Sequence, residues 1–91
     1  MIKSFRSKVL RKFAETGDGK KLPVANHARI RRMVERLEAS VVPEDMNLPG
    51  YRFHGLAGKP KHYAVDASGN YRLTFGWDGV DATDVDLEDY H

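Results

Sequence analysis

Side chains suited to proton transfer and anion binding occur in three separate stretches of the sequence. His54 and Arg72 lie in two alternating runs, and Tyr90 belongs to a third run further along. Histidine exchanges a proton near neutral pH, and arginine offers a planar pair of donors to phosphate oxygens. Tyrosine can stack on a base or donate a hydrogen bond. These residue types suit metal-free cleavage of RNA, in which a 2′-hydroxyl of the substrate attacks the adjacent phosphate.

Strand alternation would bring these side chains together. If the aromatic and aliphatic residues of each run face the core, His54, Arg72 and Tyr90 share the opposite side of the sheet. Asp89 and His91 have the wrong parity for a straight strand, so they join this group only if the chain bends. A metal site made of His54, Asp89 and His91 lacks a recognisable ligand spacing, so neither a metal nor a cofactor is expected.

The same residues also have simpler interpretations. A histidine on a strand is more often an ordinary surface residue, and a final Asp-Tyr-His is more often a frayed tail. Arg72 could pair with Asp86 or Glu88 across a hairpin, which is worth roughly 0.2–1 kcal/mol. The pattern alone therefore leaves a structural role for these side chains open.

The hydrophobic periodicity predicts two helices followed by a small sheet. The first helix is expected from its cap Ser7 to about Thr16, and the second from about Val24 to Ser40. Asp78-Gly79 is a strong signal for a two-residue hairpin loop. The expected strands are residues 51–54, 62–66, 71–77 and 84–88, with residues 2–5 as an edge strand. This order predicts an α+β domain over residues 1–91, a small antiparallel β-sheet with two N-terminal helices packed on one face.

Charge is divided unevenly along the chain. Residues 1–37 carry a balance of +8 and residues 38–91 a balance of −6, which together give the net charge of +2. The basic part favours a polyanion or an acidic protein as partner. No apolar run approaches the roughly 18 residues of a membrane span, and Met1–Arg6 is too polar for a signal peptide. Together with the absence of cysteine, this predicts a cytoplasmic protein without membrane contact.

Three segments resemble the HigB-like branch of the RelE/ParE superfamily of type II toxins. Met1–Phe5 is typical of that branch, and Asn70–Phe75 resembles its strand pattern Asn-Trp-Arg-hydrophobic-x-Phe. Asp84–His91 resembles its characteristic ending on Asp-Tyr-His. The resemblance covers essentially the full length. It implies a RelE-like microbial RNase fold and a ribosome-dependent endonuclease that cuts messenger RNA codons in the A site and inhibits translation.

The resemblance also implies residue roles and partners. Catalytic roles carry over to His54, Arg72, Asp89, Tyr90 and His91, with no cofactor. The implied partners are the ribosome with bound messenger RNA and a HigA-like helix-turn-helix antitoxin, with operator DNA reached only through the antitoxin. The basic side chains expected to contact RNA or the ribosome are Lys20, Lys21, Arg29, Arg32, Lys59 and Lys61.

Two positions depart from the family pattern. Ala57 stands where many relatives have a loop lysine, and Asp66 stands where many have an arginine. Both changes lower the positive potential that a phosphate requires, so they favour a weakened or differently specific toxin. Because the same fold also serves inhibition by binding alone, a non-catalytic ParE-like toxin and an inactive ribosome-binding module are the alternatives.

Overall fold

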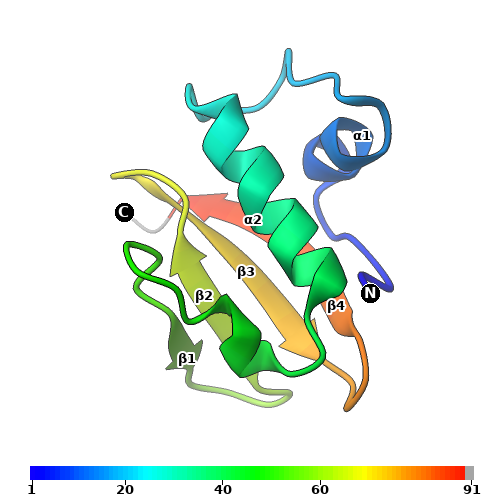
Figure 1. Cartoon of the computed structure of the whole chain (residues 1–91), viewed down its shortest axis with the longest axis vertical. Coiled ribbons are helices and arrows are strands. Elements are labelled where there is room, and N and C mark those ends of the chain that lie inside the picture. The colour runs from blue at the N-terminus through cyan, green and yellow to red at the C-terminus, as the bar shows by residue number, and fades with distance from the viewer. Residues whose placement is uncertain (90–91) are drawn as a thin grey trace.

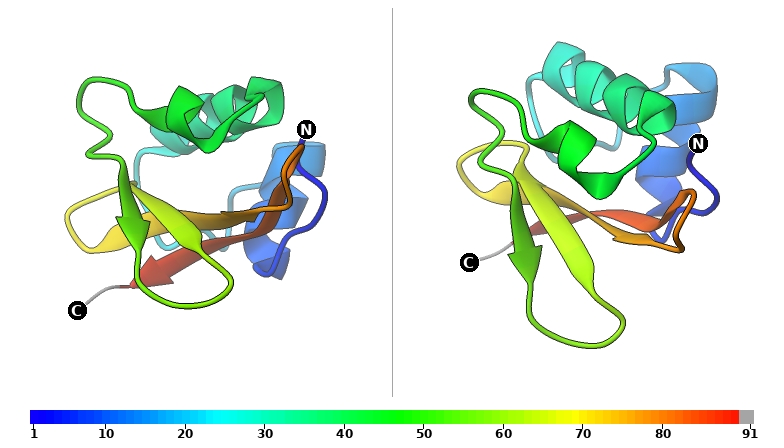
Figure 2. Two further views of the ribbon diagram at one scale, coloured as in Figure 1. Left: turned by 90° about the horizontal axis from the view of Figure 1, so that it is seen from below. Right: turned by 60° about the horizontal axis from the view of Figure 1, so that its bottom comes forward.

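The structure is a computed structural model that describes residues 1–89, in which a four-stranded antiparallel sheet carries both α-helices on one face (Figure 1). The strand order is β1-β2-β3-β4, so each strand pairs with its neighbour in sequence. Figure 2 shows the helical layer lying along one side of the sheet. The predicted α+β arrangement is therefore confirmed. The elements are α1 (Lys8–Thr16), α2 (His27–Ala39), the short 3-10 helix η1 (Pro43–Met46), β1 (His54–Leu56), β2 (His62–Asp66), β3 (Tyr71–Trp77) and β4 (Ala82–Asp89).

Capping side chains set the ends of both helices. The Ser7 hydroxyl accepts a hydrogen bond from the Leu10 amide at 3.0 Å, and Gly17 ends α1 in the left-handed conformation, with φ of 79°. These ends confirm the predicted first helix. The second helix starts three residues later than predicted, because the Asn26 side chain accepts from the Arg29 amide and so makes Asn26 the cap. Val24 lies outside that helix, yet it is buried in the core.

The predicted strand over residues 51–54 is wrong, since β1 begins only at His54. Arg52 has a φ of 51°, a left-handed conformation that interrupts an extended chain. The apolar residues Tyr51 and Phe53 alternate with polar ones because each ring has a packing partner, and not because the segment is a strand. Tyr51 lies under the Arg29 guanidinium at 5.2 Å, and the Phe53 ring stacks on Tyr63 with centroids 5.7 Å apart.

The β3–β4 hairpin has a longer loop than its sequence signal predicts. Trp77 pairs with Ala82, so the loop has four residues, Asp78 to Asp81, rather than two. The Asp78 carboxylate accepts hydrogen bonds from the Val80 and Asp81 amides at 3.0 and 2.7 Å, and these bonds close the loop. The N-terminal segment runs beside β4 through two isolated parallel bridges instead of forming a regular edge strand.

A β-bulge in β4 restores the alternation after this loop. The register shifts between Thr74 and Gly76, and Asp84 takes a φ of 49° at this point. Val85 is consequently buried with the helix-facing residues of the sheet. Among residues 1–89 no helix is long and apolar enough to cross a membrane. The core joins Leu10 and Phe13 of α1, Ile30, Met33, Val34 and Leu37 of α2, and Val65, Leu73, Phe75 and Val85 of the sheet.

Candidate active site

His54 and Arg72 lie on the same side of the sheet, as strand alternation predicts. The register joins His54, Ala64, Thr74 and Asp86 in one cross-strand row. Because Val65, Leu73 and Phe75 face the helices, this row lies on the opposite side, here called the distal face. The next row on the distal face consists of Asp66, Arg72 and Glu88.

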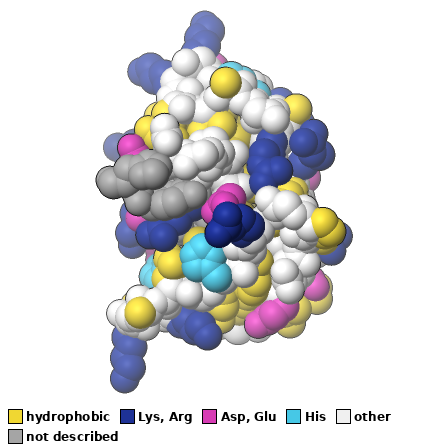
Figure 3. Space-filling view, turned by 90° about the vertical axis from the view of Figure 1, so that its left-hand side faces the viewer, with side chains coloured by type: hydrophobic (Ala, Val, Ile, Leu, Met, Phe, Trp, Pro, Cys, Tyr) yellow, Lys and Arg dark blue, Asp and Glu magenta, His cyan; other side chains and the backbone are white. Residues whose placement is uncertain are grey.

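The two rows bring His54 and Arg72 close enough together for both side chains to reach one phosphate. Strand spacing and residue rise put their Cα atoms about 12 Å apart, so the two side chains can reach toward a common group between them. Figure 3 views the molecule from the side where β1 lies, and on it a histidine adjoins basic and acidic side chains. The arrangement can therefore supply an imidazole and a guanidinium to one anionic substrate.

The backbone turn before β1 orients the His54 imidazole. His54 is exposed, and its Nδ1 lies 2.9 Å from the Arg52 carbonyl oxygen. A carbonyl can only accept, so this contact requires a proton on Nδ1 and, in the neutral ring, leaves the lone pair on Nε2. Arg52, whose left-handed conformation interrupts the predicted strand, thus fixes the orientation of the imidazole through its carbonyl oxygen. In the neutral ring Nε2 can take a proton, and in the charged ring it can give one.

Arg72 is half-buried between two acidic residues. Its direct cross-strand partners are Asp66 on β2 and Glu88 on β4. The Asp66 carboxylate lies 3.5 Å from the Arg52 guanidinium, and the Glu88 carboxylate accepts a hydrogen bond from the buried Thr74 hydroxyl. Both carboxylates therefore have a partner, which moderates their effect on the potential at Arg72.

The predicted bend of the chain does not occur before Asp89. Strand β4 continues to Asp89, which pairs with Tyr71 and so belongs to the helix-facing register of the sheet. The backbone up to that residue leaves Asp89 on the side opposite Arg72. Tyr90 and His91, the other two predicted site residues of this segment, lie outside the described residues.

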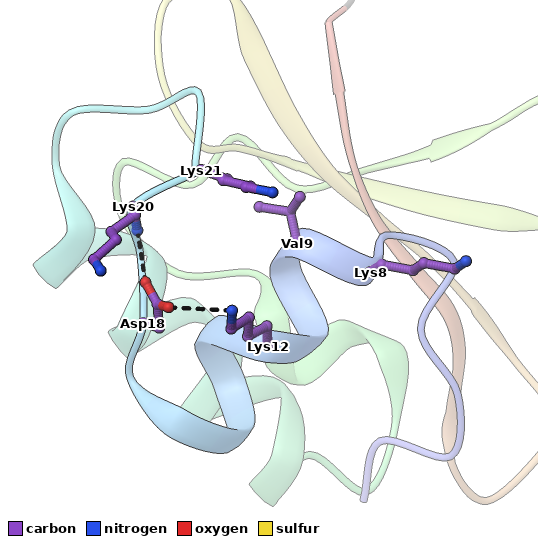
Figure 4. A pocket seen from close by; sticks show the side chains of 6 residues that line it. All are labelled: Lys8, Val9, Lys12, Asp18, Lys20 and Lys21. Carbon is purple, nitrogen blue, oxygen red and sulfur yellow. Dashed lines mark hydrogen bonds and ion pairs between the residues drawn. The ribbon is translucent and has the colours of Figure 1, made fainter.

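Two of the predicted RNA contacts, Lys20 and Lys21, line a basic pocket beside α1. The pocket has a volume of about 280 Å³, and Lys8 and Lys12 complete it from the helix (Figure 4). Asp18 accepts from the Lys20 amide at 3.1 Å and lies 3.3 Å from the Lys12 ammonium. The backbone hydrogen bond from Lys20, followed by the contact with Lys12, lowers the pKa of Asp18. Asp18 thus contacts one of the four lysine side chains, Lys12, and the backbone of a second, Lys20.

The other predicted RNA contacts lie at separate places. Arg32 is exposed on α2, and Lys59 is exposed in the loop between β1 and β2. The Lys61 ammonium lies 5.4 Å from the Tyr63 ring centroid, on the helix-facing register of the sheet. Arg29 has an internal contact, because its Nη2 donates to the Gly50 and Asp66 carbonyl oxygens at 2.8 Å each. The six residues therefore do not form one continuous patch.

The sequence interpretation missed three charged residues of these surfaces, Lys8, Lys12 and Arg52. Lys8 and Lys12 could have been found, because side chains four residues apart share one face of a helix. Arg52 gave no such signal, since its position depends on a left-handed turn. Glu88 was named from the sequence as a possible partner of Arg72, and the strand register confirms that pairing. Within residues 1–89 no three histidine, aspartate or glutamate side chains gather as a metal site would need.

Comparison with known proteins identifies the family. Residues 3–91 match the HigB-like toxins, described as RelE-like toxins of the type II toxin–antitoxin system HigB. The chain is also 30% identical to the Endoribonuclease HigB of Proteus vulgaris over 92 residues, which covers 100% of both chains. Both findings agree with the segments and the α+β fold described above. The chain therefore belongs to the HigB-like family of RelE-like toxins from type II toxin–antitoxin systems.

Proposed function

We propose that this toxin is a ribosome-dependent, metal-independent endoribonuclease that cleaves messenger RNA codons in the A site and so inhibits translation. Family membership and the name of the Proteus vulgaris relative support the ribonuclease activity. The observation that carries the proposal is the shared distal face of His54 and Arg72. An imidazole and a guanidinium on one sheet face provide proton transfer and phosphate binding without a metal.

The proposed reaction uses a nucleophile of the substrate. The ribose 2′-oxygen attacks the adjacent phosphorus, the bond to the 5′-oxygen breaks, and a 2′,3′-cyclic phosphate and a 5′-hydroxyl result. One group takes the proton of the 2′-hydroxyl, and a second group gives a proton to the 5′-oxygen. His54 acts through Nε2 in one of these steps, because its Nδ1 is used by the Arg52 carbonyl. Arg72 neutralises the negative charge that grows on the non-bridging oxygens.

The segment Asp89-Tyr90-His91 is proposed to complete the site. His91 or Asp89 supplies the second proton-transfer group, and Tyr90 stacks on a base or donates a hydrogen bond. Since Asp89 pairs with Tyr71 in the helix-facing register of β4, its role requires the end of β4 to separate from β3 and turn toward the distal face. The assignment of base and acid among His54, Asp89 and His91 stays open in this proposal.

The lysine pocket is proposed to hold ribosomal RNA while the distal face receives the message. Four lysines around one aspartate attract phosphates, and the apolar stems of these lysines and Val9 give the pocket a wall for a ribose or base. Arg32 and Lys59 are exposed and add further phosphate contacts. The side chains of Arg29 and Lys61 have internal contacts, so their share of the binding is expected to be smaller.

The proposed cellular partners follow from the type II system. A HigA-like helix-turn-helix antitoxin binds the toxin, and operator DNA is contacted only through that antitoxin. Both proteins and the ribosome then act in the cytoplasm. Because the antitoxin binds the folded toxin and not the unfolded chain, it raises the melting temperature of the toxin by mass action.

A second candidate is a ParE-like toxin or ribosome-binding module that inhibits without cleavage. The observation that favours it is the pair of acidic partners of Arg72, Asp66 and Glu88, which lowers the positive potential on the distal face. Ala57 adds to this effect, because a lysine is frequent at that position in relatives. Tight ribosome binding with intact messages would favour this candidate over the endonuclease.

Induced expression with cleavage-site mapping on cellular messages distinguishes the two. The wild-type chain is compared with His91→Ala and with a chain that lacks residues 89–91. Primer extension is expected to show codon-specific cuts for the wild type and to lose them for both variants, while circular dichroism shows that both still fold. Equal cleavage by the shortened chain would overturn the proposed site, and DNA damage without message cleavage would favour the ParE-like candidate.

A further inference from the structure

A groove of about 390 Å³ lies where the N-terminal segment meets both helices. Ile2 and Phe5 are held there by their bridges to β4, and Val34 of α2 is almost fully buried beneath the groove. Two exposed residues of α1 line the groove, Ala14 and Glu15, and the small side chain of Ala14 leaves room between the helices. The groove is lined by Ile2, Phe5, Ala14 and Val34, with Glu15, Glu35 and Glu38 among them.

The groove continues along the line of contact between α1 and α2. A smaller hollow of about 60 Å³ shares Ala14, Val34 and Glu35 with it and reaches Phe13 and Arg31. The Arg31 guanidinium covers the Phe13 ring at 5.1 Å and closes that end. The two hollows share three lining residues and together form one elongated surface of apolar and charged side chains, which we call the interhelical groove.

The interhelical groove gathers carboxylates from a part of the chain in which acidic residues are rare. Residues 1–37 hold 11 basic residues and only 3 acidic ones, and two of these three, Glu15 and Glu35, line the groove. Glu38, the next acidic residue along the chain, lines it as well and accepts a hydrogen bond from the Ile2 amide. Such a surface repels phosphates, whereas it complements apolar side chains flanked by lysine or arginine.

We propose that the interhelical groove is the docking site for a segment of the cognate antitoxin that carries apolar side chains beside basic ones. This inference rests on the antitoxin partnership and is independent of the proposed cleavage chemistry. The groove lies on the helical side of the sheet, whereas His54 and Arg72 lie on the distal face. The antitoxin segment would therefore bind without filling the active site. Its neighbour is the lysine pocket, since Lys12 and Glu15 are one turn apart on α1.

Isothermal titration calorimetry tests the proposal with the full-length chain and its purified cognate antitoxin. The target variant combines Ala14→Arg with Glu35→Lys, which fills the groove and reverses one of its charges. The control combines Ala39→Arg with Glu44→Lys, the same changes at exposed positions outside the groove. We expect the dissociation constant to rise at least about 30-fold for the target variant and less than about threefold for the control.

A second measurement keeps the test valid if the target variant folds poorly. Hydrogen exchange of the wild-type chain is compared with and without the antitoxin. Added protection of residues 1–16 and 31–38 supports the groove, whereas protection confined to residues 54–77 overturns it. A free chain that dimerises through this groove, with antitoxin affinity unchanged in the target variant, would also overturn the proposal. Message cleavage without antitoxin is measured separately, so a toxin that proves inactive leaves the binding result interpretable.

Discussion

Arg72 on β3 is the direct cross-strand partner of Glu88 on β4, on the sheet face that also carries His54. The pairing gives the proposed phosphate-binding cation an acidic neighbour, and Asp66 provides a second one from β2. The two carboxylates differ in their contacts. Asp66 is paired with the exposed Arg52, whereas Glu88 accepts a hydrogen bond from the buried Thr74. The electrostatics of the distal face are therefore set by a network rather than by one arginine.

Arg72→Lys is expected to reduce message cleavage about 10²–10³-fold, because an ammonium cannot bind two phosphate oxygens in a plane. The rate is measured on programmed ribosomes under single-turnover conditions. Arg11→Lys, at an exposed position of α1, provides the matched control and is expected to cleave at the wild-type rate. A wild-type rate for Arg72→Lys would exclude Arg72 as the phosphate ligand.

Glu88→Gln is expected to raise cleavage about threefold to tenfold. The amide oxygen still accepts from the Thr74 hydroxyl, while the loss of a charge beside Arg72 is worth about 1 kcal/mol at a partly exposed site. The same single-turnover assay measures this gain, and Glu44→Gln on η1 serves as the control. A slower variant would mean that the Glu88 carboxylate itself takes part in the reaction.

His54→Ala is expected to lower the cleavage rate about 10²–10⁴-fold, the usual contribution of one proton-transfer group. His62→Ala is a close control, because His62 occupies the same face of the neighbouring strand and its Nδ1 also lies 3.0 Å from a backbone carbonyl, that of Pro60. The control is expected to stay within threefold of the wild type. Equal losses in both variants would point to damage of the sheet rather than to catalysis by His54.

The sequence predicted the elements whose signals are local. The period-two run from Tyr71 to Trp77 is β3 itself, and Ser7 and Gly17 mark the ends of α1 as capping chemistry requires. The helix-facing aromatic Phe75 is also in the core as expected. In each case the decisive atoms lie within a few residues of one another in the chain.

The sequence offered both Asp86 and Glu88 as cross-strand partners of Arg72, and the structure confirms Glu88. The exact register was not predictable, because it depends on loop length and on a bulge. A two-residue loop at Asp78-Gly79 would have placed Val85 opposite Arg72. The four-residue loop and the extra residue at Asp84 place Glu88 there instead. The left-handed Arg52, which aims His54, was equally hidden, since a non-glycine residue gives no sign of that conformation.

The lysine pocket gives a prediction about the salt dependence of ribosome binding. Replacing Lys8 and Lys21 by glutamine is expected to make the negative slope of log K against log salt less steep by about 1.4–1.8. The reason is that binding releases fewer counterions when two phosphate contacts are lost. Co-sedimentation with ribosomes at several salt concentrations measures this slope. Arg6→Gln with Arg11→Gln removes the same charge at exposed positions outside the pocket, and an identical decrease there would show that only net charge matters.

The Asp78 loop gives a prediction about acid stability. Hydrogen bonds from the Asp81 and Val80 amides, followed by the Lys3 ammonium at 3.1 Å, lower the pKa of Asp78 from 3.8 to about 2. A lowered folded-state pKa stabilises the fold above pH 3.8, and this contribution disappears as the pH falls from about 4 to about 2. Asp78→Asn should therefore melt at a lower temperature than the wild type at pH 6, and the difference should vanish near pH 2.

The shape of this pH profile separates the carboxylate from the loop backbone. Thermal melts by circular dichroism at steps between pH 2 and 7 give the difference in melting temperature at each pH. Glu44→Gln, an exposed carboxylate of η1, is expected to follow the wild-type curve throughout. Suppose that the difference in melting temperature between Asp78→Asn and the wild type stayed constant down to pH 2. The loss of stability would then come from an asparagine amide that does not fit the loop, and not from the lost charge. The charge of Asp78 would then have no part in holding the β3–β4 loop and, through Lys3, the N-terminal segment beside β4.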